Sequence, residues 1–127
     1  MIFDSSAIIN LAEAGREESL RAGATLRLAE FEIGNFVWNR IVNLRVIDEK
    51  EGSKLLAALE ATLRLMGKVE LKDTAAALSL ALKERITYYD AFFLAAAAQY
   101  KAKLVTDDQL LQRAGKKYVE VMKSEDF

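Results

Sequence analysis

The chain of 127 residues contains no histidine and no cysteine. Without imidazole or thiolate side chains, it cannot form a zinc site from those ligands, a Ser-His-Asp triad or a Cys-His pair. A metal bound by this chain must therefore be held through oxygen, which favours Mg²⁺ or Mn²⁺, with Ca²⁺ as a further option. General acid–base chemistry is left to Asp, Glu, Lys, Tyr or a metal-bound water.

Other features are missing as well. The lack of cysteine excludes a disulfide framework, and the chain has no apolar run of membrane-spanning length. Its start, "MIFDSS", lacks the basic region of a signal peptide. We therefore expect a single cytoplasmic domain over residues 1–127, with no membrane association. The net charge of −1 provides no general attraction to nucleic acid, although a local basic groove remains compatible with it.

Apolar patterns of two kinds alternate along the chain, in the absence of any proline. Short apolar runs at 1–3, 24–29, 69–71, 102–106 and 118–122 predict strands. Helices are predicted over 4–13, 31–44, 48–66 with Gly67 as C-cap, 74–84, 90–100 and 107–117. This alternation indicates an α/β fold with a mainly parallel sheet.

The stretch "ITYYDAFFLAAAA" places one carboxylate, Asp90, at the start of an otherwise apolar helix. One interpretation is structural: Thr87 and Asp90 have the spacing of a capping box, and an acid suits the positive end of a helix. The other interpretation is functional, and it depends on where the remaining acids lie.

Four acids belong to the carboxyl edge of the predicted sheet, where α/β folds bind ligands. Asp4 follows the first strand, Glu32 lies in the first turn after the second, Asp108 follows "AKLVT", and Asp90 starts a helix at the same edge. Like charges repel strongly in a poorly solvated crevice, so the cluster requires a cation. A divalent metal ion meets that need.

Four segments resemble the PIN-domain family, and especially the short archaeal VapC-type toxin ribonucleases. These are "FDSSAIINL", "EIGNFVWN", "TYYDAFFLAAAA" and "LVTDDQLL", in the family's order and spacing. The resemblance implies a three-layer α/β/α sandwich around a parallel sheet and Mg²⁺- or Mn²⁺-dependent cleavage of RNA. By position, it assigns the metal-binding and catalytic acids to Asp4, Glu32, Asp90 and Asp108, and supporting hydroxyls to Ser6 and Thr106.

Two of these assignments have close rivals. Glu30 competes with Glu32, but Glu32 carries the "EIGN" register and shares a helix face with Asn35, Asn39 and Asn43. We expect this polar stripe, and Asn35 in particular, to line a substrate groove.

Asp107 competes in turn with Asp108, and the family's spacing favours Asp108. Asp73 also starts a predicted helix and is interpreted as an N-cap. Arg85, just ahead of "ITYYD", is a candidate contact to substrate phosphate.

The resemblance implies an endoribonuclease that is the toxin of a toxin–antitoxin pair. In its expected mechanism, Asp4, Asp90, Asp108 and Glu32 hold metal that activates water for attack on the phosphodiester. The alternatives are a PIN nuclease maturing ribosomal RNA, a non-catalytic binding module of the same fold, and a phospho-acceptor receiver domain. The receiver fits less well because Ser5 follows Asp4, where receivers have adjacent acids.

The partners expected are RNA, a second copy of the chain and a small antitoxin. Wide apolar stripes in "LLAALEATLRLMG" and "FVWNRIVNL" exceed what one sandwich needs, which favours a homodimer. Trp38, Phe36, Phe92 and Phe93 are interpreted as core or dimer contacts. We expect the antitoxin to inhibit by placing an Arg or Lys among the four carboxylates.

Overall fold

A parallel sheet of five strands runs through the middle of the molecule. The computed structural model describes all of residues 1–127. The strands, in the spatial order β3-β2-β1-β4-β5, are Gly67–Val69 (β3), Ala24–Leu26 (β2), Ile2–Phe3 (β1), Leu104–Val105 (β4) and Val121–Met122 (β5). Every neighbouring pair is parallel, and Ile2 is paired with both Ala24 and Leu104. The prediction of a parallel sheet is confirmed.

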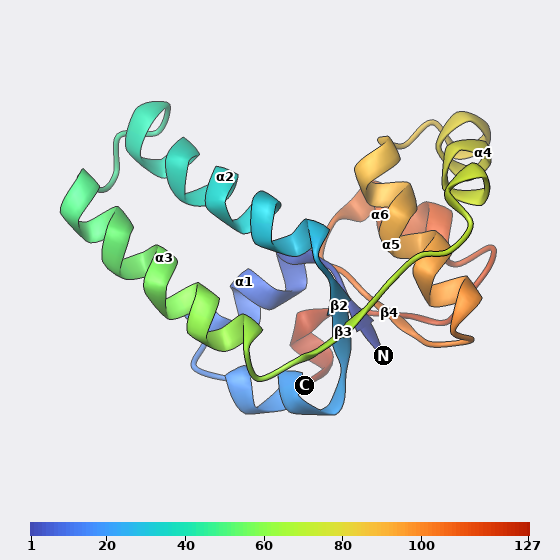
Figure 1. Cartoon of the computed structure of the whole chain (residues 1–127), viewed down its shortest axis with the longest axis horizontal. Helices are drawn as coiled ribbons and strands as arrows, with labels where there is room; N and C mark the ends of the chain where they lie inside the picture. Colours follow the sequence, from blue (N-terminus) through green and yellow to red (C-terminus); the bar gives the residue numbers. More distant parts are fainter.

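Helices cover both faces of this sheet, so the three-layer sandwich is also confirmed. One layer contains α1 (Ser5–Glu13), α2 (Leu28–Val42) and α3 (Glu49–Leu63); the other contains α4 (Thr74–Glu84), α5 (Tyr88–Gln99) and α6 (Gln109–Gly115) (Figure 1). Right-handed crossovers explain the division, because strands added on opposite sides of β1 place their helices on opposite faces. No helix combines the length and the apolar character needed to cross a bilayer.

Helix α5 is the most deeply buried helix of its layer. It packs against α4 on one side and against β1, β4 and α6 on the others. Ala91 and every residue from Phe93 to Ala97 are buried. The alanines leave room for neighbouring backbone, as expected for a helix that is apolar on all sides. The first turn of α5 is thereby fixed beside the carboxyl ends of β1 and β4.

All five strands differ from their predicted ranges. The strands predicted over 1–3, 102–106 and 118–122 are shortened to Ile2–Phe3, Leu104–Val105 and Val121–Met122. The second strand ends at Leu26 rather than near Ala29, because Arg27 adopts helical backbone angles and α2 begins at Leu28. Glu32 therefore lies in the second turn of α2, not the first. The third strand is Gly67–Val69 rather than 69–71, since Gly67 pairs with Ala24 of β2.

Helix α3 accordingly ends sooner than predicted. Its last residue is Leu63 and its C-cap is Arg64, so Gly67 is not a C-cap. The start of α3 is as predicted: Glu51 N donates to Asp48 Oδ1 at 2.7 Å, and Asp48 N donates to Glu51 Oε1 at 3.4 Å. Gly52 is buried against Ile41 of α2, where a Cβ would collide, and this lets α2 and α3 pack closely.

Candidate active site

A cavity of about 340 Å³ opens at the carboxyl edge of the sheet. It lies where the chain order switches direction, beside the ends of the adjacent strands β1 and β4, and such switch points are where open α/β sheets bind ligands. Its lining consists of Asp4, Ser5, Ser6, Ile9, Asn10, Glu32, Phe36, Asp90 and Asp108. All four acids predicted for the site, from four separate segments of the chain, face this one cavity.

Asp4 lies deepest, with only 4% of its surface exposed. It follows β1 directly and is the N-cap of α1, where its Oδ1 accepts from Ala7 N at 3.0 Å. Ser6 Oγ donates to the same oxygen at 2.7 Å, and the Thr106 hydroxyl donates to Oδ2. Both carboxylate oxygens are therefore held by a hydroxyl group, as expected for supporting residues.

The same two hydroxyls also hold the segment after β4. Ser6 Oγ accepts from Asp107 N at 3.0 Å, and Thr106 Oγ1 accepts from Asp108 N at 3.1 Å. Each hydroxyl thus connects the carboxylate at the end of β1 with the backbone at the end of β4. This network positions Asp4 relative to Asp108 across more than 100 residues of sequence.

Glu32 reaches the cavity from the second turn of α2. Its Oε1 accepts a hydrogen bond of 2.8 Å from Ser5 Oγ, which ties α2 to the start of α1. Glu30 is exposed and lines a different hollow, beside Glu60 and Lys68. The structure therefore places Glu32, and not Glu30, with the other acids.

Asp90 lies in the first turn of α5, where the capping prediction is half right. Thr87 is the N-cap, and its Oγ1 accepts from Asp90 N at 3.1 Å. The return bond of a capping box, from Thr87 N to the Asp90 carboxylate, is not formed. The cap is supplied by the threonine, and the carboxylate of Asp90 faces the cavity instead.

Asp107 and Asp108, the two acids after β4, have different roles. Asp108 is the N-cap of α6, accepts from Leu111 N at 2.8 Å and lines the cavity. Asp107 accepts from Asn10 Nδ2 at 2.6 Å and from Ser124 N at 2.8 Å, which fastens the C-terminal turn η2 (Ser124–Asp126) to α1. These bonds lower the pKa of Asp107 against the opposing effect of burial, as expected for a structural ion.

Burial, with a smaller contribution from mutual repulsion, raises the pKa of three carboxyl groups that face the cavity. Burial raises the pKa of Asp4 to about 6, with a smaller contribution from the charge of Asp90. Burial likewise raises the pKa of Asp90, assisted by Asp108, and that of Glu32, assisted by Asp90. No lysine or arginine lines the cavity to offset these charges.

The oxygen atoms that face the cavity are the kind of ligand that a divalent metal ion requires. In this structure no three carboxylates converge closely enough to form a ready-made set of ligands, and mutual repulsion favours such separation. The donors are nevertheless oxygen atoms only, from four acids facing one cavity without a basic neighbour. That chemistry fits Mg²⁺ or Mn²⁺ and excludes a soft-ligand metal.

Besides Thr106, which holds Asp4 without lining the cavity, three predicted residues lie outside it. Arg85 is exposed on the turn between α4 and α5, with φ of 55°. Asn35 lines a neighbouring groove on α2. Asp73 is the N-cap of α4 and accepts from Ala76 N at 3.1 Å, so its interpretation as a cap is confirmed.

Sequence reasoning missed other residues of the cavity wall, including Ser5, Asn10 and Phe36. The role of Ser5 depends on a contact with Glu32, 27 residues away, which no local pattern reveals. Asn10 had a usable signal: it lies four residues after Ser6, on the same face of α1. Phe36 had one too, lying four residues after Glu32.

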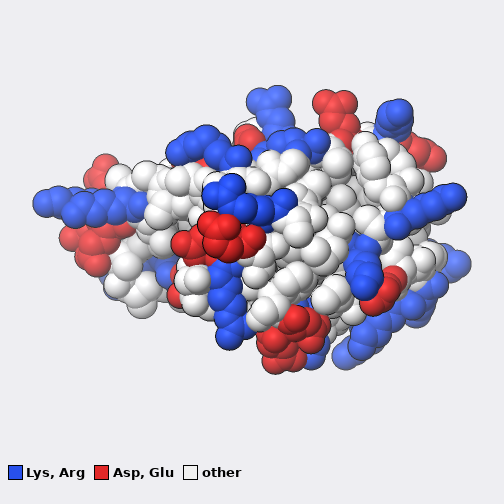
Figure 2. Space-filling view, turned by 90° about the horizontal axis from the view of Figure 1, so that it is seen from below, with Lys and Arg blue, Asp and Glu red and all other residues white.

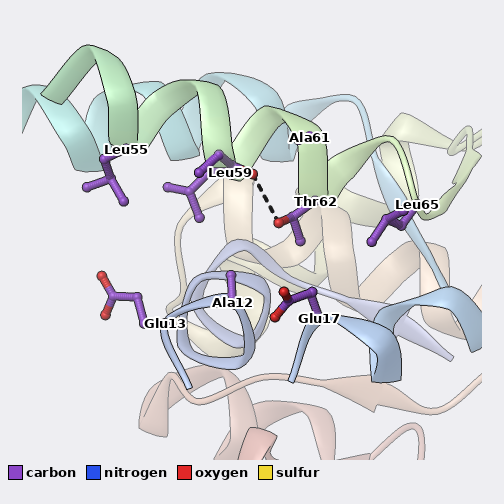
Figure 3. A pocket seen from close by; sticks show the side chains of 9 residues that line it. Ala12, Glu13, Glu17, Leu55, Leu59, Ala61, Thr62 and Leu65 are labelled. Atoms are coloured by element: carbon purple, nitrogen blue, oxygen red, sulfur yellow. Dashed lines mark hydrogen bonds between the residues drawn. The ribbon is translucent and has the colours of Figure 1, made fainter. Parts of the chain in front are cut away.

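A larger hollow, of about 440 Å³, lies between α1 and α3 (Figure 3). Leucines and alanines form most of its wall, and a hydrogen bond from Thr62 Oγ1 to Ala58 O stays within α3. Of its two acids, Glu13 pairs with Arg40 at 2.8 Å, and one oxygen of Glu17 is buried without a partner. Lacking a set of acids, this hollow is not a candidate metal site.

Comparison with known proteins agrees with this geometry. The family model of the PIN domain matches residues 1–117. The chain belongs to the PIN-domain family. A ribonuclease VapC3 from Pyrobaculum aerophilum is 34% identical over 123 residues, covering 87% of this chain and 91% of that protein.

The fold is supported independently by a solved structure. The crystal structure of PAE2754 from Pyrobaculum aerophilum matches with a TM-score of 0.85 at 24% identity, covering 98% of this chain and 90% of that one. Membership of the PIN-domain family supports a nuclease as the class of enzyme and removes the receiver-domain alternative.

Proposed function

We propose that this protein is a metal-dependent endoribonuclease that hydrolyses RNA phosphodiester bonds, and that it is the toxin of a toxin–antitoxin pair. One observation carries the nuclease proposal: Asp4, Glu32, Asp90 and Asp108 line a single cavity that contains no basic side chain. The similarity to a protein named ribonuclease VapC3 supports RNA as the substrate and a toxin as the biological role.

In this proposal Asp4, Asp90 and Asp108, with Glu32, would hold one or two Mg²⁺ or Mn²⁺ ions. Such ions, when bound, supply an activated water and stabilise charge on the phosphoryl oxygens. The protein's own contribution is to fix the acids. Ser6 and Thr106 would hold the Asp4 carboxylate in one orientation, and hydrogen bonds of this kind also sustain metal affinity.

RNA recognition must rely on local contacts rather than on the overall field. The net charge is −1, and Figure 2 shows basic and acidic side chains interspersed over the face it displays. Arg85 is exposed five residues ahead of Asp90, which supports its proposed contact with a substrate phosphate. Asn35, one turn after Glu32 on α2, would contact the substrate beside the cavity.

The test of the nuclease proposal is incubation of the purified protein with defined RNAs. We expect cleavage with Mg²⁺ or Mn²⁺, none in EDTA, and restoration by either ion, whereas chelators selective for Zn²⁺ should have little effect. Asp90→Asn should be inactive under all these conditions. Cleavage by the wild-type protein after exhaustive EDTA treatment would refute the metal-dependent mechanism.

If the protein is a toxin, it should bind two protein partners, a second copy of the chain and an antitoxin. Trp38, Val42 and Leu44 are 50%, 46% and 58% exposed on and after α2, and Leu82 of α4 is 73% exposed. Apolar surface of this kind favours burial against another chain. We expect a homodimer in solution, and inhibition by a small antitoxin whose Arg or Lys enters the acidic cavity and pairs with the carboxylates.

Sedimentation velocity and inhibition assays check these partners. The expected result is a dimer at micromolar concentration, together with loss of cleavage when a small protein encoded beside this one is added. A strictly monomeric nuclease that no such protein inhibits would refute the toxin assignment and leave the nuclease proposal intact.

A further inference from the structure

A second groove adjoins the acidic cavity. Helix α2 contributes Leu28, Phe31, Glu32, Asn35, Phe36 and Asn39 to its wall, and α5 contributes Tyr89. This aromatic groove has a volume of about 460 Å³. Because Glu32 and Phe36 line both the groove and the acidic cavity, whatever occupies the cavity can continue into the groove.

The chemistry of the aromatic groove is that of a site for a flat, neutral ring. Phe31 and Tyr89, from different helices, are 65% and 59% exposed, so their rings are available to a ligand. The groove's single charge is Glu32, and no lysine or arginine lines it to bind a phosphate. An exposed aromatic ring binds any nucleobase by stacking, without needing a particular sequence.

Amide groups lie beside the rings. Asn39 Oδ1 accepts from Asn43 Nδ2 at 2.7 Å, which fixes the orientation of Asn39 and leaves its own amide N–H groups to donate. Asn35 is exposed on the same side of α2. Amides of this kind match the edges of bases rather than an apolar protein segment.

Phe36 is held in position between the two sites. The guanidinium of Arg40 lies over its ring, 4.3 Å from the centroid, and Arg40 is itself paired with Glu13. Arg40 therefore holds the Phe36 ring, which forms part of the wall shared by the groove and the cavity. A strand with its phosphate in the cavity would meet a preformed surface for the adjoining base.

We propose that the aromatic groove binds one unpaired nucleobase of the RNA, next to the phosphate that the cavity of the four carboxylates would hold when loaded with metal. This inference rests on the proposed ribonuclease function and adds to it a base-binding subsite beside the acidic cavity. A base within a duplex is stacked and paired, so it cannot enter a groove between Phe31 and Tyr89.

The test asks whether the loss of one base and the loss of the Phe31 ring have the same effect on RNA binding. Short single-stranded RNAs, each with an abasic ribose at a different position, are titrated into the Asp90→Asn protein with Mn²⁺ present, and Kd is measured by fluorescence anisotropy. We expect one abasic position to weaken binding by about tenfold, the loss of one base–aromatic stack. In the double variant Phe31→Ala, Asp90→Asn, that position should no longer matter.

Tyr100→Ala provides the matched control, because Tyr100 is a half-exposed aromatic residue at the end of α5 that does not line the groove. It should retain the full abasic effect in the same Asp90→Asn background, and Phe31→Tyr should restore it. Melting temperatures verify that each variant is folded.

The outcomes separate this inference from the proposed function. If no abasic position weakens binding, or if Phe31→Ala leaves the effect unchanged, the inference is overturned even where the wild-type protein cleaves RNA. If the coupling is found but the wild-type protein cleaves no RNA, the nuclease proposal fails and the base site stands. Dissociation of a dimer by Phe31→Ala with an unchanged abasic effect would assign the groove to a second copy of the chain.

Discussion

Acids that cap helices occur in two regions of this molecule, and they make the same kind of capping hydrogen bond in both. Asp48 and Asp73 begin α3 and α4, accept a first-turn N–H at 2.7 and 3.1 Å, and are exposed. Asp4 and Asp108 begin α1 and α6 and accept the equivalent N–H at 3.0 and 2.8 Å, but they face other acids across one cavity.

The comparison shows that capping and membership of a site are not alternatives. A carboxylate at a helix start satisfies a backbone N–H with one oxygen and presents the rest of its charge elsewhere. Whether that charge meets water or other acids is decided by the sheet, which brings the ends of β1 and β4 together.

The largest difference should appear in catalysis. Asp4→Asn or Asp90→Asn should lower kcat/KM for RNA cleavage by about a thousandfold or more, because metal-assisted charge stabilisation contributes several kcal/mol. Asp73→Asn should leave cleavage unchanged. Initial rates of cleavage of one RNA substrate with Mn²⁺ measure these effects. A loss of kcat/KM for Asp73→Asn as large as that for Asp4→Asn would show that the exposed caps and the cavity acids do not differ in catalysis.

The next largest effect should be the pH dependence of the free energy of unfolding of the metal-free protein. Because the pKa of Asp4 is raised from 3.8 to about 6, the folded state binds more protons than the unfolded chain across that interval. The associated stability, about 3 kcal/mol, is fully present below about pH 4 and lost as the pH rises through 6. The raised pKa values of Glu32 and Asp90 act in the same direction, and the lowered pKa of Asp107 opposes them.

Urea unfolding in EDTA between pH 4 and 7.5 measures this effect. The free energy of unfolding of Asp4→Asn relative to wild type should increase as the pH rises. Curves that remain parallel over the whole range would show that Asp4 carries no such penalty.

Removing the hydroxyl that holds Asp4 should have an intermediate effect. Thr106→Val should lower Mn²⁺ affinity or activity by about 10- to 100-fold, the usual cost of losing an orienting hydrogen bond. Thr62→Val is the control, since the Thr62 hydroxyl donates to Ala58 O within its own helix. If both valine variants lose Mn²⁺ affinity equally, the network around Asp4 has no special role.

The smallest effects should be on stability, through the loss of helix capping. Asp73→Ala should cost about 0.5–2 kcal/mol of stability and spare cleavage. Asp90→Asn should leave the metal-free protein equally or more stable, because it removes repulsion and Thr87 supplies the cap. Thermal melts in EDTA measure both, and a loss for Asp90→Asn as large as that for Asp73→Ala would make its capping role dominant.

The sequence was sufficient for the architecture because its evidence is distributed along the chain. Alternating patterns predict a parallel sheet, and a parallel sheet brings the residues after its strands to one edge. That reasoning placed Asp4, Asp90 and Asp108 together without coordinates. The choice of Glu32 over Glu30 came instead from the resemblance to the PIN-domain family and from the polar face of the helix, and only Glu32 lines the cavity.

The remainder depends on contacts that no local pattern encodes. The end of β2 is set by the backbone of Arg27, and the third strand by the pairing of Gly67 with Ala24. The partnership of Ser5 with Glu32 depends on how α1 meets α2, and the structural role of Asp107 depends on the C-terminal turn. Both required the assembled fold.

Mn²⁺ binding tests the central claim most directly, namely that these four carboxylates together form a site for a divalent cation. Isothermal titration calorimetry should be performed on the wild-type protein, Asp90→Asn and Asp73→Asn. We predict that the wild type and Asp73→Asn bind Mn²⁺ with equal affinity, whereas Asp90→Asn binds at least tenfold more weakly, a difference of about 1.4 kcal/mol. Equal affinities for all three proteins would contradict the claim.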